Sequence, residues 1–208
     1  LSASRVHDRF SIDGWTALRD IADTAADLAP TLTPGDDTAR AMTRLLYKIA
    51  ALSGLMHENM FRFTDWQFLT LGRSMERTAA IADVLSHFAD PEAPEGSLEV
   101  ALELGDCTMT YHRRYSLGGQ RDTVVDLMVF DTMNPRAILF QLEQIRGHVA
   151  RLPGAEEFGL MSPLARALLK IHSELAVQTP ETVDSEVLTD LVEELAEASD
   201  LLSTAYLS

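Results

Sequence analysis

Two arginines and a glutamate lie close together in the segment Trp66–Phe88. Arg73 and Arg77 are four residues apart, so both rise from one face of a helix, and Glu76 lies three residues after Arg73. At about 100° per residue, both arginines fall in an arc of apolar side chains that includes Ile81. A guanidinium on a core-facing stripe is unfavourable unless it is paired. The pattern therefore predicts either a buried ion-pair hub between helices or a carboxylate- or anion-binding site built on a guanidinium fork.

A second polar group consists of Asp106, Thr110, Arg113 and Arg114, in a segment that we expect to be one helix over residues 97–115. Spacings of four and three residues place Asp106, Thr110 and Arg113 on one stripe of that helix. A carboxylate, a hydroxyl and a guanidinium on one stripe could converge on a small polar ligand. The alternative is a solvated helix face whose local salt bridges add little stability.

The third group is the motif DTMNPR, Asp131–Arg136. Asn134 followed by Pro135 predicts a helix start, with Asn134 as the N-cap. A helix N-terminus offers free N–H groups and a positive dipole, so it favours an anion, and Arg136 would reinforce that preference. A basic residue in the first turn is unfavourable for the helix itself, which favours a binding or pairing role. The alternative is ordinary capping with Arg136 in solvent.

Familiar motifs of metal, nucleotide and nucleophile chemistry are missing from the sequence. Phe61 stands where a zinc-protease motif beginning at His57 would need its second histidine, and the six histidines show no ligand spacing. There is no Walker loop and no GxGxxG segment, and the single cysteine, Cys107, is expected to be buried filler. We therefore expect this chain to hold no metal and no cofactor of its own.

Charge and composition limit the classes of partner that this chain is expected to bind. The chain has 208 residues, 46% of them hydrophobic, and 17 basic against 32 acidic residues give a formal net charge of −15. Such a surface repels nucleic acid and anionic membranes, so neither is expected as a partner. A single cysteine and the absence of a signal peptide or membrane-spanning run indicate a reducing, cytoplasmic location. The first residue is Leu1 rather than Met, so we expect a piece of a longer protein.

The secondary-structure elements that position these three polar groups are expected to be helices throughout. Apolar periodicity and start signals at Ser11, Thr64, Ser97, Asn134 and Ser162 predict an all-α bundle of seven to eight helices without a sheet, in one domain over residues 1–208. The run TVVDLMVF, residues 123–130, is β-branched enough for a strand, but no partner strand exists, so we interpret it as a short buried helix. The expected helices span about 12–29, 37–63, 64–88, 97–115, 123–130, 135–152, 163–177 and 183–206.

Together these motifs resemble the Alpha-E family, a bacterial all-helical domain named for its helices and a Glu-Arg motif. Family members often carry an additional N-terminal helical segment with its own LGRxxER-like sequence, which is absent here. The chain thus resembles the later part of the domain, which implies the C-terminal part of a longer protein. The resemblance covers most of the chain and rests on RVHDRFSIDGW (Arg5–Trp15), LSGLMHENMFR (Leu52–Arg62), LGRSMER (Leu71–Arg77), DCTMTYHRRY (Asp106–Tyr115) and DTMNPRAILFQLE (Asp131–Glu143).

The resemblance implies a place beside circularly permuted ATP-grasp proteins and transglutaminase-like proteins, and hence a role in ATP-dependent amide or peptide bond formation or processing. ATP and Mg would enter only through such a partner. We expect a non-catalytic accessory domain that binds a carboxylate, a phosphate or an acidic peptide. Its expected binding residues are Arg73, Glu76, Arg77, Asp106, Thr110, Arg113, Arg114, Asn134 and Arg136.

Two alternatives stay open at this point. The chain could be an enzyme acting on amide or peptide bonds, with Glu76 or Asp106 as the acid or base. It could also be a purely structural interaction module, in which ion pairs fix the helix packing and the acidic surface binds a basic partner. A second copy of the chain is a further candidate partner.

Overall fold

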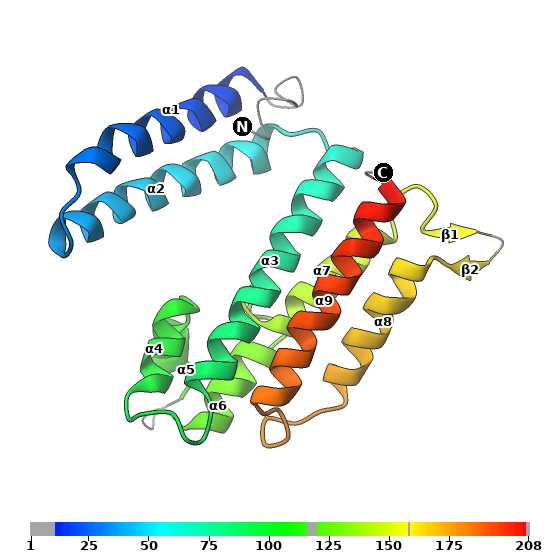
Figure 1. The fold of residues 1–208 in the computed structure, drawn as a ribbon. Helices are drawn as coiled ribbons and strands as arrows, with labels where there is room; N and C mark the ends of the chain where they lie inside the picture. The colour runs from blue at the N-terminus through cyan, green and yellow to red at the C-terminus, as the bar shows by residue number, and fades with distance from the viewer. Residues whose placement is uncertain (1–10, 116–119, 158, 207–208) are drawn as a thin grey trace. The chain divides into compact units, whose positions relative to one another are not determined.

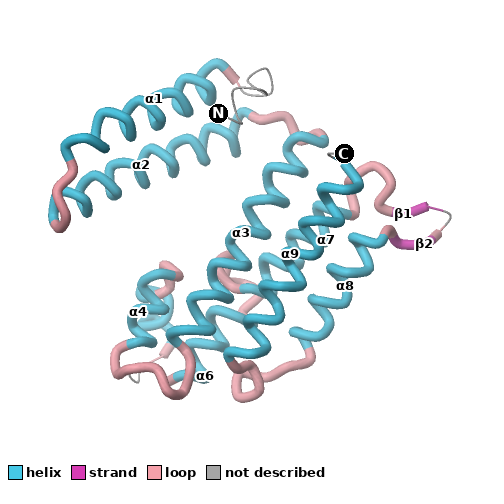
Figure 2. The backbone as a smooth tube through the Cα atoms, in the orientation of Figure 1, coloured by secondary structure: helices cyan, strands magenta, loops and turns pink. Residues whose placement is uncertain are grey.

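The computed structural model describes residues 11–115, 120–157 and 159–206. Within those ranges it contains nine α-helices, one π turn and one minimal β hairpin (Figures 1 and 2). The all-α prediction is confirmed, whereas the predicted number of seven to eight helices is too low. Residues 1–66 and 67–208 form two compact units. The expectation of a single domain stays a prediction.

The first unit contains two antiparallel helices, α1 (Ile12–Leu28) and α2 (Asp36–Asn59), joined through the short 3-10 turn η2 (Ala29–Thr31). The start of α1 is the predicted one, because the Ser11 hydroxyl accepts a hydrogen bond of 3.1 Å from the backbone N–H of Gly14. An ion pair between Lys48 and Asp20 links the two helices. Few side chains of these helices are buried, so their mutual packing forms only a small core.

The second unit is a bundle in which four long helices run side by side (Figure 1). They are α3 (Thr64–Phe88, in this unit from Gln67 onward), α7 (Ile138–Val149), α8 (Pro163–Ala176) and α9 (Ser185–Tyr206). At one end lie α4 (Ser97–Leu104), α5 (Thr108–Arg114), α6 (Arg121–Val125) and the π turn η3 (Asp126–Phe130). The strands β1 (Glu156–Glu157) and β2 (Leu160–Met161) pair as an antiparallel hairpin between α7 and α8. Side chains from most of these elements fill one core, including Leu71, Tyr111, Leu127, Leu142, Leu168 and Leu188.

The segment 97–115 is two helices rather than the predicted one. Gly105 ends α4, and the N–H groups of Asp106 and Cys107 bond back to the carbonyls of Glu103 and Leu102 at 3.0 and 2.8 Å. These two bonds form a Schellman motif, which requires a left-handed residue just after the helix, and Asp106 has φ 53°. The chain therefore turns at Asp106, and α5 leaves in a new direction.

The ambiguous run 123–130 is helical, as interpreted from the sequence. It forms the end of α6 and the π turn η3, which closes with a bond of 3.0 Å from the N–H of Asp131 to the carbonyl of Asp126. Val124, Val125 and Leu127 are fully buried there. Burial on most sides explains why the run is apolar except at Thr123 and Asp126, which are only half-buried.

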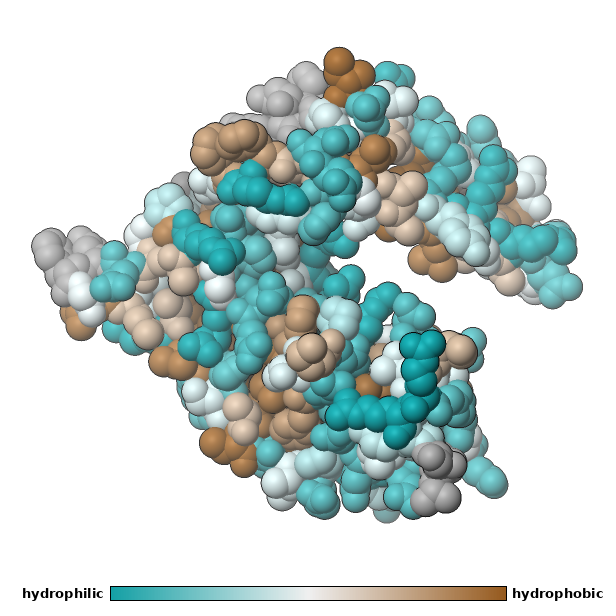
Figure 3. Space-filling model, turned by 180° about the vertical axis from the view of Figure 1, so that it is seen from behind, coloured by the Kyte–Doolittle hydropathy of each residue, from teal (hydrophilic) through white to brown (hydrophobic). Residues whose placement is uncertain are grey.

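No helix in the described ranges has both the length and the apolar content needed to cross a membrane. On the face shown in Figure 3, hydrophilic side chains predominate and hydrophobic ones lie between them in several smaller patches. Such a mixture is ordinary on a protein surface.

Candidate functional site

The buried stripe of α3 is not the one that contains the arginines. It consists of Leu71, Ser74, Met75, Thr78, Ile81, Ala82 and Leu85. Arg73 and Glu76 are exposed, and Arg77 is half-buried at the border of the stripe. The prediction of a buried Arg/Glu cluster is therefore wrong for Arg73 and Glu76, and it holds only in part for Arg77.

Two hydroxyl residues caused this displacement of the stripe. Ser74 and Thr78 are in the core, where Thr78 is fully buried and its Oγ1 donates to the carbonyl of Ser74 at 2.8 Å. Because this local bond satisfies the hydroxyl, its burial costs little. Including Ser74 and Thr78 in the buried stripe moves its centre away from Arg73 and Arg77.

Arg77 lies in a positively charged neighbourhood. Burial lowers its pKa, and the nearby charges of Arg136 and Arg73 lower the pKa further. Arg136 comes from the segment before α7, so the fold joins two of the three groups recognised in the sequence.

Asp106 connects the remaining group to this neighbourhood. Its carboxylate accepts a hydrogen bond of 2.7 Å from Nη2 of Arg136, and the two side chains are 78% and 40% exposed. We call Arg73, Arg77, Asp106 and Arg136 the Arg77 group. Within this group, Arg136 engages the carboxylate of Asp106, and the Arg77 guanidinium lies near those of Arg73 and Arg136.

Asn134 does not cap a helix, which corrects the third prediction. The helix α7 begins at Ile138 after Ala137, and no side chain caps its N-terminus. Asn134 instead lies between two consecutive turns, closed by bonds of 2.9 Å from its N–H to Asp131 and from Ala137 to its carbonyl. Its Oδ1 accepts from the N–H of Arg136 at 3.0 Å. An Asn-Pro pair suits such a turn as well as a helix start.

The amide of Asn134 is a structural bridge below the Arg77 group. It is buried, and its Nδ2 donates to the carbonyl of Leu127 at 2.9 Å and contacts Sγ of Cys107 at 3.5 Å. Burial raises the pKa of the Cys107 thiol, which the Asn134 amide and Arg136 partly oppose. Cys107 is therefore buried filler, as expected, and its environment is unsuited to a thiolate nucleophile.

Arg114 forms a separate pair that sequence reasoning did not identify. Its guanidinium pairs with Asp131, whose side chain is 12% exposed. Beside it, the Tyr115 hydroxyl donates to Asp126 at 2.7 Å, and burial together with this carboxylate raises the pKa of Tyr115 to about 12. The pairing residues Asp126 and Asp131 are distant in sequence from Tyr115 and Arg114, so no local spacing signals them.

Thr110 and Arg113 are not brought into these contacts. Both are exposed on α5. The predicted stripe with Asp106 does not exist, because the helix is broken between Asp106 and Thr110. Of the nine expected binding residues, the structure thus brings together Arg73, Arg77, Asp106, Asn134 and Arg136.

This arrangement is suited to holding an anion. The half-buried guanidinium of Arg77 lies near those of Arg73 and Arg136, and the N-terminus of α7, which begins two residues after Arg136, has no side-chain cap and adds positive potential. Across the described residues, no group of three or more His, Cys, Asp or Glu side chains has a geometry that could hold a metal ion.

Comparisons with known proteins add a family but no activity. A family described as "Alpha-E: a predicted alpha-helical domain with a conserved ER motif" matches residues 1–207. Uncharacterised proteins of Mycobacterium tuberculosis and Mycobacterium bovis are 29% identical to this chain over 205 residues. The match covers 95% of the chain but only 23% of each relative, so the chain spans less than a quarter of their length. No solved structure matches.

Proposed function

Because the chain belongs to the Alpha-E family, we propose that its Glu-Arg motif marks an anion-binding site in a non-catalytic helical module. Glu76-Arg77 is the only Glu-Arg dipeptide in the sequence, so the motif in the family description corresponds to these residues. The observation that carries the proposal is the half-buried guanidinium of Arg77 beside the like charges of Arg73 and Arg136.

Like charges at a partly buried position destabilise the folded chain. An arrangement of this kind is favourable when an anion shares the guanidiniums, and it is otherwise better replaced by an apolar residue. A carboxylate or a phosphate matches a guanidinium fork in shape and charge, so we propose a small carboxylate, a phosphate or an acidic peptide as the ligand. The pair with Asp106 fixes the direction of the Arg136 guanidinium.

For the biological setting, we propose an accessory role in peptide or amide ligation. The partner would be an ATP-grasp-type ligase or a transglutaminase-like protein, and ATP and Mg would bind to that partner. This part of the proposal is supported by the family resemblance, since such proteins accompany Alpha-E members. The alternative of catalysis by Glu76 or Asp106 has less support, because both are exposed and Asp106 is engaged by Arg136.

The test is a titration of the protein with inorganic phosphate and with acetate at constant ionic strength, read by calorimetry and by NMR shifts of arginine side chains. We expect saturable binding of at least one of these anions, weakened about tenfold or more in Arg77→Met and Arg136→Met. Arg166→Met is the matched control, because Arg166 is exposed on α8. Absence of saturable binding, or equal weakening in the Arg166 variant, would refute the proposal.

A further inference from the structure

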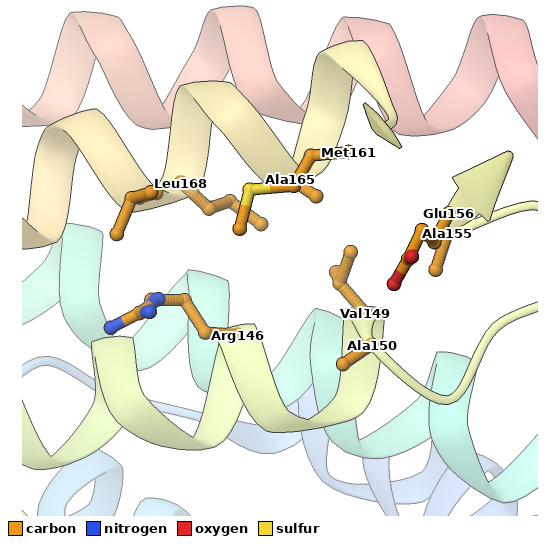
Figure 4. Close-up of a pocket in the computed structure, with 9 residues that line it drawn as sticks. Arg146, Val149, Ala150, Ala155, Glu156, Met161, Ala165 and Leu168 are labelled. Carbon is orange, nitrogen blue, oxygen red and sulfur yellow. The ribbon is translucent and has the colours of Figure 1, made fainter. Parts of the chain in front are cut away.

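A pocket lies between α7, α8 and the β hairpin, on a part of the second unit that the Arg77 group does not use. Its volume is about 170 Å³. Val149, Ala165 and Leu168 give it an apolar wall, with Leu168 at the same end as Arg146 (Figure 4). An apolar cavity of about 150 Å³ takes a ligand the size of benzene, so this pocket has room for a short hydrocarbon chain.

Opposite charges stand at the two ends of this pocket. Figure 4 shows the guanidinium of Arg146 at one end and the carboxylate of Glu156 at the other. Neither side chain has a hydrogen bond or ion pair with any other residue that the structure describes. Charged groups that flank an apolar wall without pairing with each other are available to a ligand that carries the complementary charges.

A buried histidine nitrogen adds polarity at the arginine end. His172 follows Leu168 by one turn of α8, and its Nε2 is buried without a hydrogen-bond partner among the described residues. Arg146 lies close enough to His172 to lower the pKa of the imidazole, which burial lowers more strongly. Glu143 also acts on His172, in the opposite direction. The cation that lines this end of the pocket is Arg146, so a ligand carboxylate is placed there.

We propose that this pocket binds a zwitterion whose carboxylate and ammonium are separated by a saturated carbon chain, as in ε-aminocaproate or a C-terminal lysine. The carboxylate pairs with Arg146, the chain lies against Val149, Ala165 and Leu168, and the ammonium pairs with Glu156. This ligand matches the order of charge, apolar wall and opposite charge along the pocket. The assignment is independent of the anion site around Arg77.

The experiment compares three ligands of similar length by NMR titration of the full chain. They are ε-aminocaproate, with both charges, caproate, with the carboxylate only, and hexylamine, with the ammonium only. We expect ε-aminocaproate to bind about tenfold or more tightly than either single-charge ligand, with shifts at Val149, Ala165 and Leu168. Equal affinity for all three, or shifts that avoid these residues, would overturn the assignment.

Variants test the Arg146 end and the Glu156 end of the pocket separately. Arg146→Met should abolish the advantage of ε-aminocaproate over hexylamine, and Glu156→Gln should abolish its advantage over caproate. Ala165→Leu fills the middle of the pocket without touching either charge and should weaken all three ligands. Arg166→Met, on the same helix and exposed, should change nothing. Unchanged affinity in Ala165→Leu would show that the ligands bind elsewhere.

A last comparison distinguishes a free small molecule from a peptide terminus. A short peptide that ends in lysine is compared with the same peptide whose C-terminus is amidated. A preference for the free carboxylate that disappears in Arg146→Met supports the site for a peptide terminus, and binding of ε-aminocaproate alone supports it for a small molecule. If neither ligand binds, the proposal fails.

Discussion

Asp106 accepts a hydrogen bond of 2.7 Å from Arg136 while its own backbone is left-handed, with φ 53°. Among the described residues it is the only non-glycine with a positive φ. Glycine is the usual residue at this position of a Schellman motif, and aspartate is one of the few other residues that adopt the left-handed conformation, at a small cost. Asp106 therefore serves both as the left-handed residue that ends α4 and as the acceptor of the bond from Arg136.

The first prediction distinguishes what the backbone conformation of Asp106 contributes to stability from what its carboxylate contributes. Asp106→Gly should leave the free energy of unfolding within about 1 kcal/mol of the parent, because relief of strain offsets the loss of an exposed ion pair. Asp106→Val should lose about 1–2 kcal/mol, since a β-branched residue is poorly tolerated at positive φ. Urea unfolding measures both values. Equal losses in the two variants would show that the carboxylate, not the backbone, sets the stability.

The second prediction concerns the like charges around Arg77. Arg77→Met removes a half-buried cation beside Arg73 and Arg136 and keeps an apolar stem of similar length. Without added anion, the melting temperature should stay the same or rise, equivalent to as much as about 1 kcal/mol. If Arg77 instead stabilised the helix packing through ion pairs, Arg77→Met would lower the melting temperature. A drop of several degrees in the melting temperature would favour the structural alternative for this motif.

The third prediction tests the buried amide of Asn134. Asn134→Ala leaves the carbonyl of Leu127 and the N–H of Arg136 without their partners, so unfolding should become easier by about 2–3 kcal/mol. Chemical denaturation measures the loss. Gln144→Ala, at an exposed position of α7, is the matched control and should change stability by less than about 0.5 kcal/mol. A neutral Asn134 variant would mean that water replaces the amide.

The fourth prediction concerns Arg121, which joins three separate parts of the second unit. Its guanidinium donates to the carbonyls of Ala89 at 2.8 Å, of Pro180 at 3.0 Å and of Val183. Arg121→Met should cost about 2–4 kcal/mol, because the fork is lost and three carbonyls lose a donor. Arg121→Lys should recover less than half of that loss, since an ammonium cannot reproduce the planar fork. Full recovery by lysine would contradict this geometric account.

The fifth prediction follows from two histidines, the buried His148 and the half-buried His172. Burial, and then a neighbouring arginine, lowers the pKa of His148 and of His172 below the ordinary value of 6.5. In acid the unfolded chain takes up protons that the folded histidines resist, so the free energy of unfolding should fall as pH drops from about 7 to about 5. His148→Gln should reduce this dependence by on the order of 1 kcal/mol.

The candidate site was recognisable in part from local sequence. Arg73 and Arg77 were found because their spacing is read along one helix, and Arg136 because it follows a turn motif. The partners of Arg114 and Tyr115 were not found, because Asp131 and Asp126 reach them through the packing of η3 against α5. Local spacing carries no information about such contacts.

The sequence by itself determined that this chain is helical, where most helices begin, and that arginines gather in a few segments. Those features follow from periodicity, from caps such as Ser11 and Ser162, and from the proline and glycine breaks, all of which act over a few residues. Only the tertiary structure decided which face of α3 is buried and that Arg77, Arg136 and Asp106 meet. The physical reason is that burial of Ser74 and Thr78 and the left-handed turn at Asp106 are stabilised by contacts that exist only once the helices have packed.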